Sequence, residues 1–371
     1  MQFSPVQSAA IDAVAGWFYY ASAKRPIFRI WGFAGTGKTT LARHFAEQVD
    51  GRVHYAAFTG KAAMVMRKNG CEGATTIHST IYKVDIDEET GRTKFKKRPK
   101  FDLEGVKLFI IDECSMVDED LGKDLLSFGI PVLVLGDPAQ LPPVNGGGYF
   151  TNAEPDVMLT EIHRQAAENP ILRAATAVRE GRPIKHGDFG ALRIIRREDV
   201  NPYLVTSVDQ VLVGMNKTRT AYNERLRELA GFDSPMPQNG DILVALKNDS
   251  TLGIFNGGLW KVLDLNHRPK GSLNDHCVHM CVKSLDFDDA APVDVRVREE
   301  FFRGRGLQVD WKERRGTQEF DFGYALTVHK SQGSQWQNVC LFDESSTFGA
   351  DRGRHLYTGI TRASETLTIV M

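Results

Sequence analysis

The segment GFAGTGKTT at 32–40 constrains the fold more than any other stretch of this sequence. It follows the apolar run FRIW and opens the helical pattern TTLARHFAEQV, as the motif GxxxxGK[ST] requires. In such a turn the glycines let backbone N–H groups surround a triphosphate, and the helix N-terminus adds its positive dipole end. Lys38 is expected to reach the β- and γ-phosphate oxygens, and Thr39 to bind Mg²⁺. The segment therefore predicts a nucleotide site made by Gly35, Thr36, Gly37, Lys38, Thr39 and Thr40.

Short apolar runs alternate with helical stretches through the first half of the chain. Such runs are typical of a parallel sheet covered by helices on both faces. A helix is predicted at 169–181, with Asn169 as N-cap, Pro170 in the first turn and Gly181 past its end. The predicted strands are 26–31, 52–58, 106–112, 130–137 and 156–160.

The second half repeats this rhythm and is interrupted once. A helix is predicted at 218–231. Between roughly 240 and 318 the pattern changes to short strands and turns, which indicates a small all-β module inserted into a second α/β lobe. The predicted strands of that lobe are 191–197, 209–216, 320–328, 338–344 and 366–371.

The segment VDIDEETGRTKFKKRPK at 84–100 is predicted to form a β-hairpin inserted into the first lobe. Its return arm places Lys94, Lys96 and Lys97 around Phe95. Two interpretations are open at this point. The arm is either a charged, solvated edge that prevents aggregation, or a basic finger with an aromatic tip beside a nucleic-acid track.

The overall composition excludes some classes of protein. The chain has 371 residues, enough for two or three domains, and its net charge of −1 means that nucleic-acid binding would need local basic patches. No apolar run is long enough to cross a bilayer, and the N-terminus lacks the features of an export signal. We therefore predict no membrane partner and a cytoplasmic protein.

Five cysteines, an odd number, fit a reducing compartment. Cys277, His279 and Cys281 alternate within 275–282, and three such side chains on one face of a strand could hold zinc. A second supplier of ligands is missing from the pattern, so a half-buried strand is the alternative.

Two further strand ends carry side chains suited to phosphoryl transfer. Asp112 and Glu113 end the run LFIIDE; Asp112 is placed to hold Mg²⁺, and Glu113 could polarise an attacking water. In VLVLGDPAQLPPV, Asp137 is expected to turn the loop and Gln140 to sense the γ-phosphate.

Two arginines and one glutamine complete the set of nucleotide-site residues. Arg164 in LTEIHRQ and Arg362 in LYTGITRA could stabilise the transferring phosphoryl group from across a domain cleft. Gln7 follows Ser4 and Pro5 in a pattern typical of a capping box, and its amide could alternatively grip the adenine edge.

The run ALTVHKSQGSQW at 325–336 places imidazole, ammonium, hydroxyl and amide groups at a strand end. Together with SPVQ, GFAGTGKTT, AAFTGKAA, TTIHST, IIDECSMVD, LGDPAQLPPV, HRQ and LYTGITRA, in that order along the chain, it resembles the superfamily 1B helicases, and the RecD-like and Dda-like enzymes in particular. The resemblance covers nearly the whole chain.

The resemblance implies an ATP-dependent enzyme that moves 5′ to 3′ on single-stranded DNA and unwinds tailed duplexes, with ATP and Mg²⁺ as cofactors. Gln7 becomes an adenine-reading residue as well as a cap, and Arg164 and Arg362 become arginine fingers. Gly333 and Gln335 are expected to face the nucleotide, although the pair Gln335-Trp336 departs from many relatives and leaves a ribose contact open. The implied DNA-binding residues are Phe58, Thr59, Lys61, Thr76, His78, Phe95, Lys96, Thr327, His329, Lys330 and Ser331.

The implied fold has two RecA-like lobes, parallel sheets with helices on both faces. The first is expected at 1–83 and 101–185, and the second at 186–239 and 319–371. The hairpin at 84–100 becomes a short pin that splits the duplex, and the module at 240–318 an SH3-like domain. Such an enzyme is expected to act as a monomer in a bacterial cell or a phage-infected host, with replication, repair or recombination proteins as possible partners.

Three other functions are considered. A small-molecule P-loop kinase accounts for 32–40 but not for the second lobe. A non-catalytic DNA-binding subunit would not need Lys38, Asp112, Glu113 and Arg362 together. A motor subunit of a larger recombination or nuclease complex would share all of these residues.

Overall fold

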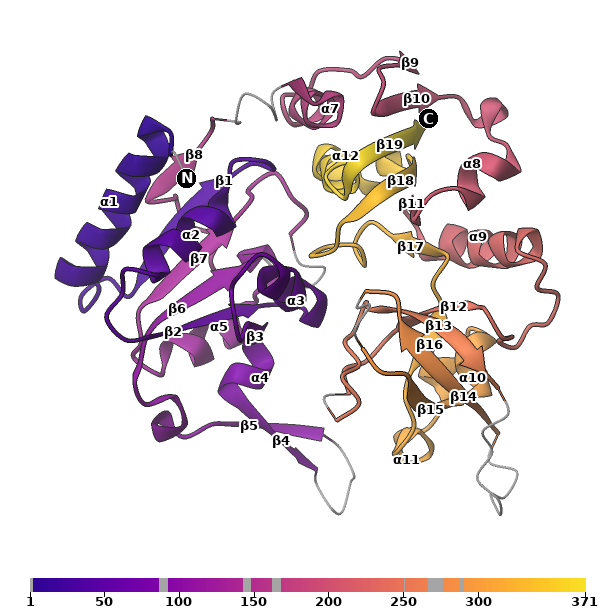
Figure 1. Cartoon of the computed structure of the whole chain (residues 1–371), viewed down its shortest axis with the longest axis horizontal. Coiled ribbons are helices and arrows are strands. Elements are labelled where there is room, and N and C mark those ends of the chain that lie inside the picture. The colour runs from indigo at the N-terminus through magenta and orange to yellow at the C-terminus, as the bar shows by residue number, and fades with distance from the viewer. Residues whose placement is uncertain are drawn as a thin grey trace.

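The computed structural model describes residues 3–86, 93–142, 148–161, 168–249, 251–265, 276–286 and 290–371, with the side chains of 84–86, 93–95 and 307 left out. Its elements form two α/β lobes, a β module and a hairpin (Figure 1). The predicted α/β fold with two largely parallel sheets is confirmed.

The first lobe is built on a parallel sheet whose described strands run in the order β3-β2-β6-β7-β1-β8. All five strands predicted in this half are present. The strands are β1 (Ile27–Gly32), β2 (Arg52–Ala57), β3 (Thr75–Thr76), β6 (Val106–Asp112), β7 (Val132–Gly136) and β8 (Val157–Leu159). The helices are α1 (Pro5–Tyr20), α2 (Lys38–Ala46), α3 (Gly60–Lys68), α4 (Ile77–Ile81) and α5 (Glu119–Leu126), with 3₁₀ turns η1 (Lys100–Leu103) and η2 (Cys114–Met116).

Period-two alternation along the strands divides the core of this lobe into two layers. Ile110 of β6 packs towards α1 and α2, with Val14 and Leu41. Its neighbour Phe109 packs towards α4 and α5 on the opposite face. Both faces of the sheet are therefore buried, as continuous apolar strands require.

The second lobe contains a sheet in the order β17-β11-β18-β19-β10-β9, parallel except for the pair β9 and β10. Its strands are β9 (Gly187–Asp188), β10 (Leu192–Ile195), β11 (Gln210–Val213), β17 (Ala325–Thr327), β18 (Trp336–Phe342) and β19 (Ala363–Val370). Its helices are α7 (Pro170–Arg179), α8 (Pro202–Thr206), α9 (Asn216–Leu229) and α12 (Arg352–Ile360), with 3₁₀ turns η3 (Arg197–Asp199) and η5 (Ser345–Asp351). The helix α7 lies in the range 101–185 expected for the first lobe, but its apolar face packs on α12 of the second.

The β module is an antiparallel sheet in the order β15-β14-β13-β12-β16. Its strands are β12 (Ile242–Ala245), β13 (Leu259–Asp264), β14 (Cys277–Ser284), β15 (Val293–Arg298) and β16 (Phe320–Phe322), and its helical turns are α10 (Glu299–Phe302), η4 (Gly306–Gln308) and α11 (Trp311–Arg314). The hairpin pairs β4 (Tyr82–Ile86) with β5 (Thr93–Lys97) and projects from the first lobe (Figure 1).

The single strand predicted at 320–328 is wrong. The chain changes sheets within it: β16 pairs with β12 of the module, and β17 pairs with β11 of the second lobe. Gly323 makes the change possible, because a Cβ there would lie 2.8 Å from the Leu243 carbonyl carbon. An apolar run alone does not distinguish one strand from two that belong to different sheets.

Candidate functional site

The P-loop joins β1 to α2 and follows the carboxyl end of β1, which lies between β7 and β8 in the first sheet. Gly35 and Gly37 both have φ of 80°, a left-handed conformation that favours glycine. Lys38 opens α2, and its Nζ donates to the carbonyl oxygens of Gly32 at 2.6 Å and Phe33 at 3.2 Å. The ammonium is thus held over the loop, next to the backbone that would surround a phosphate.

Thr39 and Asp112 meet at the base of the loop. The Thr39 hydroxyl donates to Asp112 Oδ2 at 2.6 Å, and Asp112 Oδ1 accepts the Glu113 N–H at 2.8 Å. A hydroxyl and a carboxylate provide hard oxygen ligands, and Mg²⁺ typically uses one or two protein ligands together with substrate phosphates. This pair therefore fits the predicted magnesium site.

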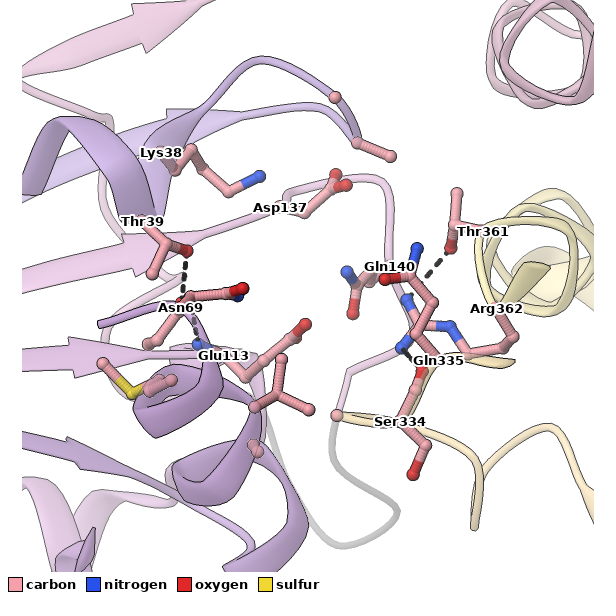
Figure 2. Close-up of a pocket in the computed structure, with 17 residues that line it drawn as sticks. Lys38, Thr39, Asn69, Glu113, Asp137, Gln140, Ser334, Gln335, Thr361 and Arg362 are labelled. Atoms are coloured by element: carbon pink, nitrogen blue, oxygen red, sulfur yellow. Dashed lines mark hydrogen bonds between the residues drawn. The ribbon is translucent and has the colours of Figure 1, made fainter. Parts of the chain in front are cut away.

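Glu113 has an uncommon backbone conformation for a residue with a side chain, with φ 51° and ψ 44°. Such a conformation costs roughly 1–3 kcal/mol and is found preferentially at functional sites. Figure 2 shows the side chain directed into the cleft towards Arg362. Burial raises the pKa of the Glu113 carboxyl, Arg362 opposes this shift, and Asp112 adds to it.

The turn after β7 brings Asp137 and Gln140 to the same cleft. Asp137 Oδ1 accepts the Ala139 N–H at 3.0 Å, which forms the turn that the sequence predicted. Gln140 is buried, and among the described residues its Oε1 accepts no hydrogen bond. An unpartnered buried amide oxygen in a cleft beside the P-loop is suited to contact a ligand or its bound water.

The second lobe closes the other side of the cleft. Arg362 is buried, and its guanidinium donates to Thr358 O at 3.0 Å, Ser334 O at 3.1 Å and Thr361 Oγ1 at 3.0 Å. Gly333 lies so near α3 that a Cβ would be 2.9 Å from Thr59 Oγ1. The cleft has a volume of about 240 Å³ and is lined by Ala34, Gly35, Lys38, Thr39, Ala62, Val65, Met66, Asn69, Asp112, Glu113, Asp137, Gln140, Gly333, Ser334, Gln335, Thr361 and Arg362 (Figure 2).

Gln7 both caps a helix and contacts the P-loop. It completes a capping box with Ser4, and its Nε2 also donates to the carbonyl of Thr36 at 3.1 Å. Thr36 is buried in the loop. The amide is therefore anchored beside the P-loop, where an adenine edge could reach it. Thr40, in the first turn of α2, borders a second hollow beside the loop.

Several residues predicted to bind DNA lie where the first lobe faces the rest of the molecule. Thr59 and Thr76 are N-caps of α3 and α4. The rings of Phe58 and His78 lie 5.9 Å apart in an edge-on arrangement. Lys61 is buried, with its Nζ 3.1 Å from Asp286 Oδ1.

The second-lobe residues predicted to bind DNA differ in exposure. Thr327 and Ser331 are buried; Thr327 Oγ1 accepts the Lys330 N–H at 3.3 Å, and the Ser331 hydroxyl donates to Val328 O at 2.7 Å. Both hydroxyls therefore shape the turn. Lys330 is exposed and His329 half-buried, so these two are the members of the cluster that an external phosphate could reach.

Two predicted site residues cannot be placed. Arg164 and the side chain of Phe95 lie outside the described residues. Lys96 is exposed on β5. The neighbouring Lys97 and Tyr82 both bond to Asp124 of α5, at 3.0 and 2.6 Å, which anchors the base of the hairpin to the first lobe.

The zinc interpretation of 275–282 gains no support. Among the residues that the structure describes, no group of three or more His, Cys, Asp or Glu side chains is arranged to hold a metal ion. Cys277 is buried in β14, while His279 and Cys281 are half-buried.

Sequence reasoning assigned no role to Gln332, Tyr357 and Thr358, which connect the two lobes. Tyr357 and Thr358 lie in the quoted string LYTGITRA and Gln332 in ALTVHKSQGSQW, so the motifs contained the signal. The motifs did not reveal the hydrogen-bond partners of these three residues, which lie about 190–320 positions away in the chain.

Two family models match the chain. An AAA domain matches residues 3–197, which is more than half of the chain, and a UvrD-like helicase C-terminal domain matches residues 322–370. Among the residues that the structure describes, no helix is long and apolar enough to span a membrane.

Individual proteins resemble the chain as well. The ATP-dependent RecD2 DNA helicase of Deinococcus radiodurans is 29% identical over 98% of this chain and 48% of its own length. The ATP-dependent DNA helicase dda of phage T4 is 34% identical over 41% of this chain and 37% of its own length. The chain thus spans less than half of each of these relatives.

A solved structure shows the same fold. The crystal structure of Bacteroides Pif1 bound to ssDNA superposes with a TM-score of 0.61 at 18% identity, and the match covers 100% of this chain and 92% of that one. The two lobes are RecA-like.

Proposed function

This chain belongs to superfamily 1B of the helicases, and we propose that it is an ATP-driven motor that moves 5′ to 3′ along single-stranded DNA and unwinds tailed duplexes. The observation that carries the proposal is a cleft lined by both lobes. The P-loop, Glu113 and Gln140 come from one side, and Gly333, Gln335 and Arg362 from the other. A nucleotide bound there would touch both lobes and bias them towards closure.

In this proposal the residues of the cleft divide the work of hydrolysis. Lys38 leaves its carbonyl partners to pair with the β- and γ-phosphates, while Thr39 and Asp112 would hold Mg²⁺, which neutralises phosphate charge when bound. Glu113 orients a water oxygen towards the γ-phosphorus and takes up its proton as the bond to the β–γ bridging oxygen breaks. Arg362 supplies positive charge to the transferring group. ADP and inorganic phosphate are the products.

The DNA would run across the faces of the two lobes that carry the predicted contacts. Phe58 and His78 on the first lobe offer rings for base stacking, and Lys330 on the second offers charge for a phosphate. Gly333 links the two functions, because it lies against Thr59 of α3 and also lines the nucleotide cleft. Closure at the nucleotide would thereby change the spacing of the DNA contacts.

The cellular setting that we propose is the cytoplasm of a bacterial cell or of a phage-infected host, which fits relatives from a bacterium and a phage. Because the chain spans less than half of these relatives, action within a larger recombination or nuclease assembly is the second candidate. The small-molecule kinase is disfavoured, because Arg362 and Gly333 line the side of the cleft where a phosphoryl acceptor would bind.

The decisive experiment measures ATP turnover with and without single-stranded DNA, and then unwinding of duplexes with a 5′ or a 3′ tail. We expect stimulation by the single strand and unwinding from the 5′ tail. A turnover rate that ignores DNA would refute the motor. Unwinding from the 3′ tail alone would refute only the direction.

A further inference from the structure

The turn after β7, residues 137–141, is covalently part of the first lobe but packs into the second. Leu141 is 2% exposed and lies in the same apolar cluster as Leu356 and Ile360 of α12. Its N–H donates to Thr358 Oγ1 at 3.0 Å, and its carbonyl accepts Gln332 Nε2 at 2.9 Å. Both main-chain polar groups of Leu141 are therefore satisfied by the second lobe.

Tyr357 of α12 adds a third and more central connection. Its hydroxyl donates to Asp137 Oδ2 at 2.6 Å and accepts the N–H of Ala34 in the P-loop at 3.1 Å. One oxygen of the second lobe thus joins the P-loop to the turn that carries Gln140. Burial, followed by the charge of Asp137, raises the pKa of Tyr357 and so favours the neutral hydroxyl, which is the form that donates to Asp137.

The position of Arg362 depends on the same helix. Tyr357 does not line the cleft, whereas Arg362, two residues past the end of α12, does. The guanidinium of Arg362 is held by Thr358, Thr361 and Ser334, all of the second lobe. Arg362 is therefore oriented by its own lobe. That lobe contacts the P-loop through the Tyr357 hydroxyl and through Arg179 of α7, whose guanidinium carbon lies 3.4 Å from the centroid of the Phe33 ring.

We propose that Tyr357 is a positioning residue that sets Arg362 at the correct distance from the P-loop, so that turnover, rather than nucleotide binding, depends on its hydroxyl. The proposal rests on the function proposed above. It assigns Tyr357 no contact with the nucleotide. Its consequence is that the two hydrogen bonds of one buried hydroxyl decide whether the arginine of the second lobe acts on a phosphate bound by the first.

The variant Tyr357→Phe tests this directly, because it keeps the ring in the apolar cluster and removes only the hydroxyl. Tyr324 offers a matched control. Its hydroxyl donates to Asp241 Oδ1 at 2.9 Å and accepts the Ile242 N–H at 3.2 Å, the same pattern within the second lobe and β module and away from the cleft. Tyr324→Phe should therefore reproduce any general cost of losing a buried tyrosine hydroxyl.

We expect Tyr357→Phe to lower kcat for ATP at saturating single-stranded DNA by about tenfold or more, as for a lost hydrogen bond to a charged acceptor. The dissociation constant of a fluorescent ATP analogue should stay within about twofold, and the melting temperature within about 3 °C of that of Tyr324→Phe. Wild-type kcat, weakened nucleotide binding with unchanged kcat, or a larger loss of stability would each overturn the proposal.

A second measurement distinguishes action through Arg362 from any other route. In an Arg362→Ala background, single-turnover hydrolysis should be no slower when Tyr357→Phe is added, because the residue being positioned is gone. A further decrease equal to that in the wild-type background would overturn the proposal. Stimulation of wild-type turnover by DNA is measured separately. A lack of stimulation would count against the proposed function, whereas an unchanged kcat in Tyr357→Phe would count against this inference alone.

Discussion

Two contacts between the first lobe and the rest of the described molecule differ in chemistry. On the nucleotide side, Leu141 and Asp137 are held by buried hydrogen bonds and by the apolar packing of α12. At the start of α3, Lys61 instead pairs with Asp286 of the β module at 3.1 Å. The ring of Trp336 lies 4.4 Å from the same ammonium.

The difference indicates which contact can be exchanged during a cycle. Breaking the nucleotide-side contact would expose the apolar cluster around Leu141 to water, which is costly. The ammonium of Lys61 could replace the Asp286 carboxylate with a DNA phosphate and keep its charge paired. We interpret the first contact as a permanent joint and the second as one that DNA can open.

The largest expected effect separates nucleotide chemistry from DNA binding. Lys38→Ala should reduce ATP turnover by about 10²- to 10³-fold, because a charge that stabilises the transferring phosphoryl group is lost. Single-stranded DNA binding, measured by fluorescence anisotropy, should stay within about threefold. Lys107→Ala, an exposed lysine on β6 of the same lobe, serves as the control. Retained turnover would disprove the assignment of the P-loop.

An intermediate effect should appear in the pH dependence of turnover. In the proposed mechanism Glu113 acts in its ionised form. Burial raises its pKa, so kcat should fall on acidification at a higher pH than an unperturbed glutamate would give. Arg362 lowers this pKa. Removing it in Arg362→Ala should therefore move the acidic limb of the kcat profile to still higher pH. Arg354→Ala changes an exposed arginine of α12 and should leave the limb in place. An acidic limb that does not move in Arg362→Ala would show that Arg362 does not influence the pKa of Glu113 that governs turnover.

The smallest effect tests the contact at α3. Asp286→Asn should tighten single-stranded DNA binding by about threefold, because the carboxylate that competes with phosphate for Lys61 is neutralised. The main-chain bond from Lys68 to the Asp286 carbonyl is unaffected by the change. Glu319→Gln, which alters ion pairs to Lys247 and Arg314 in the module, is the matched control. Unchanged or weaker binding would make the Lys61–Asp286 pair a structural contact, equivalent in kind to the first.

Much of the fold and of the nucleotide site could be predicted because the signals are local. The P-loop depends on glycines within a few residues of Lys38, and the buried strands are continuous apolar runs in a parallel sheet. Asp112 and Glu113 end a predicted strand, and the carboxyl ends of parallel strands meet at one edge of the sheet. Arg362 was proposed because a complete P-loop calls for an arginine from across a cleft, and the family resemblance then identified it as an arginine finger.

By itself, the sequence determined that this chain has a P-loop, two α/β lobes and an interposed β module. Backbone geometry and hydrophobic periodicity depend on residues that are close together in the sequence. Only the tertiary structure decided that 320–328 divides between two sheets, that Lys61 meets Asp286, and that Tyr357 joins Ala34 to Asp137. The contacts of Lys61 and Tyr357 join residues that are more than 200 positions apart in the chain. The division of 320–328 depends on which sheet offers a free edge to each half of the segment. No local period encodes such a choice, because it is made by packing of the whole chain.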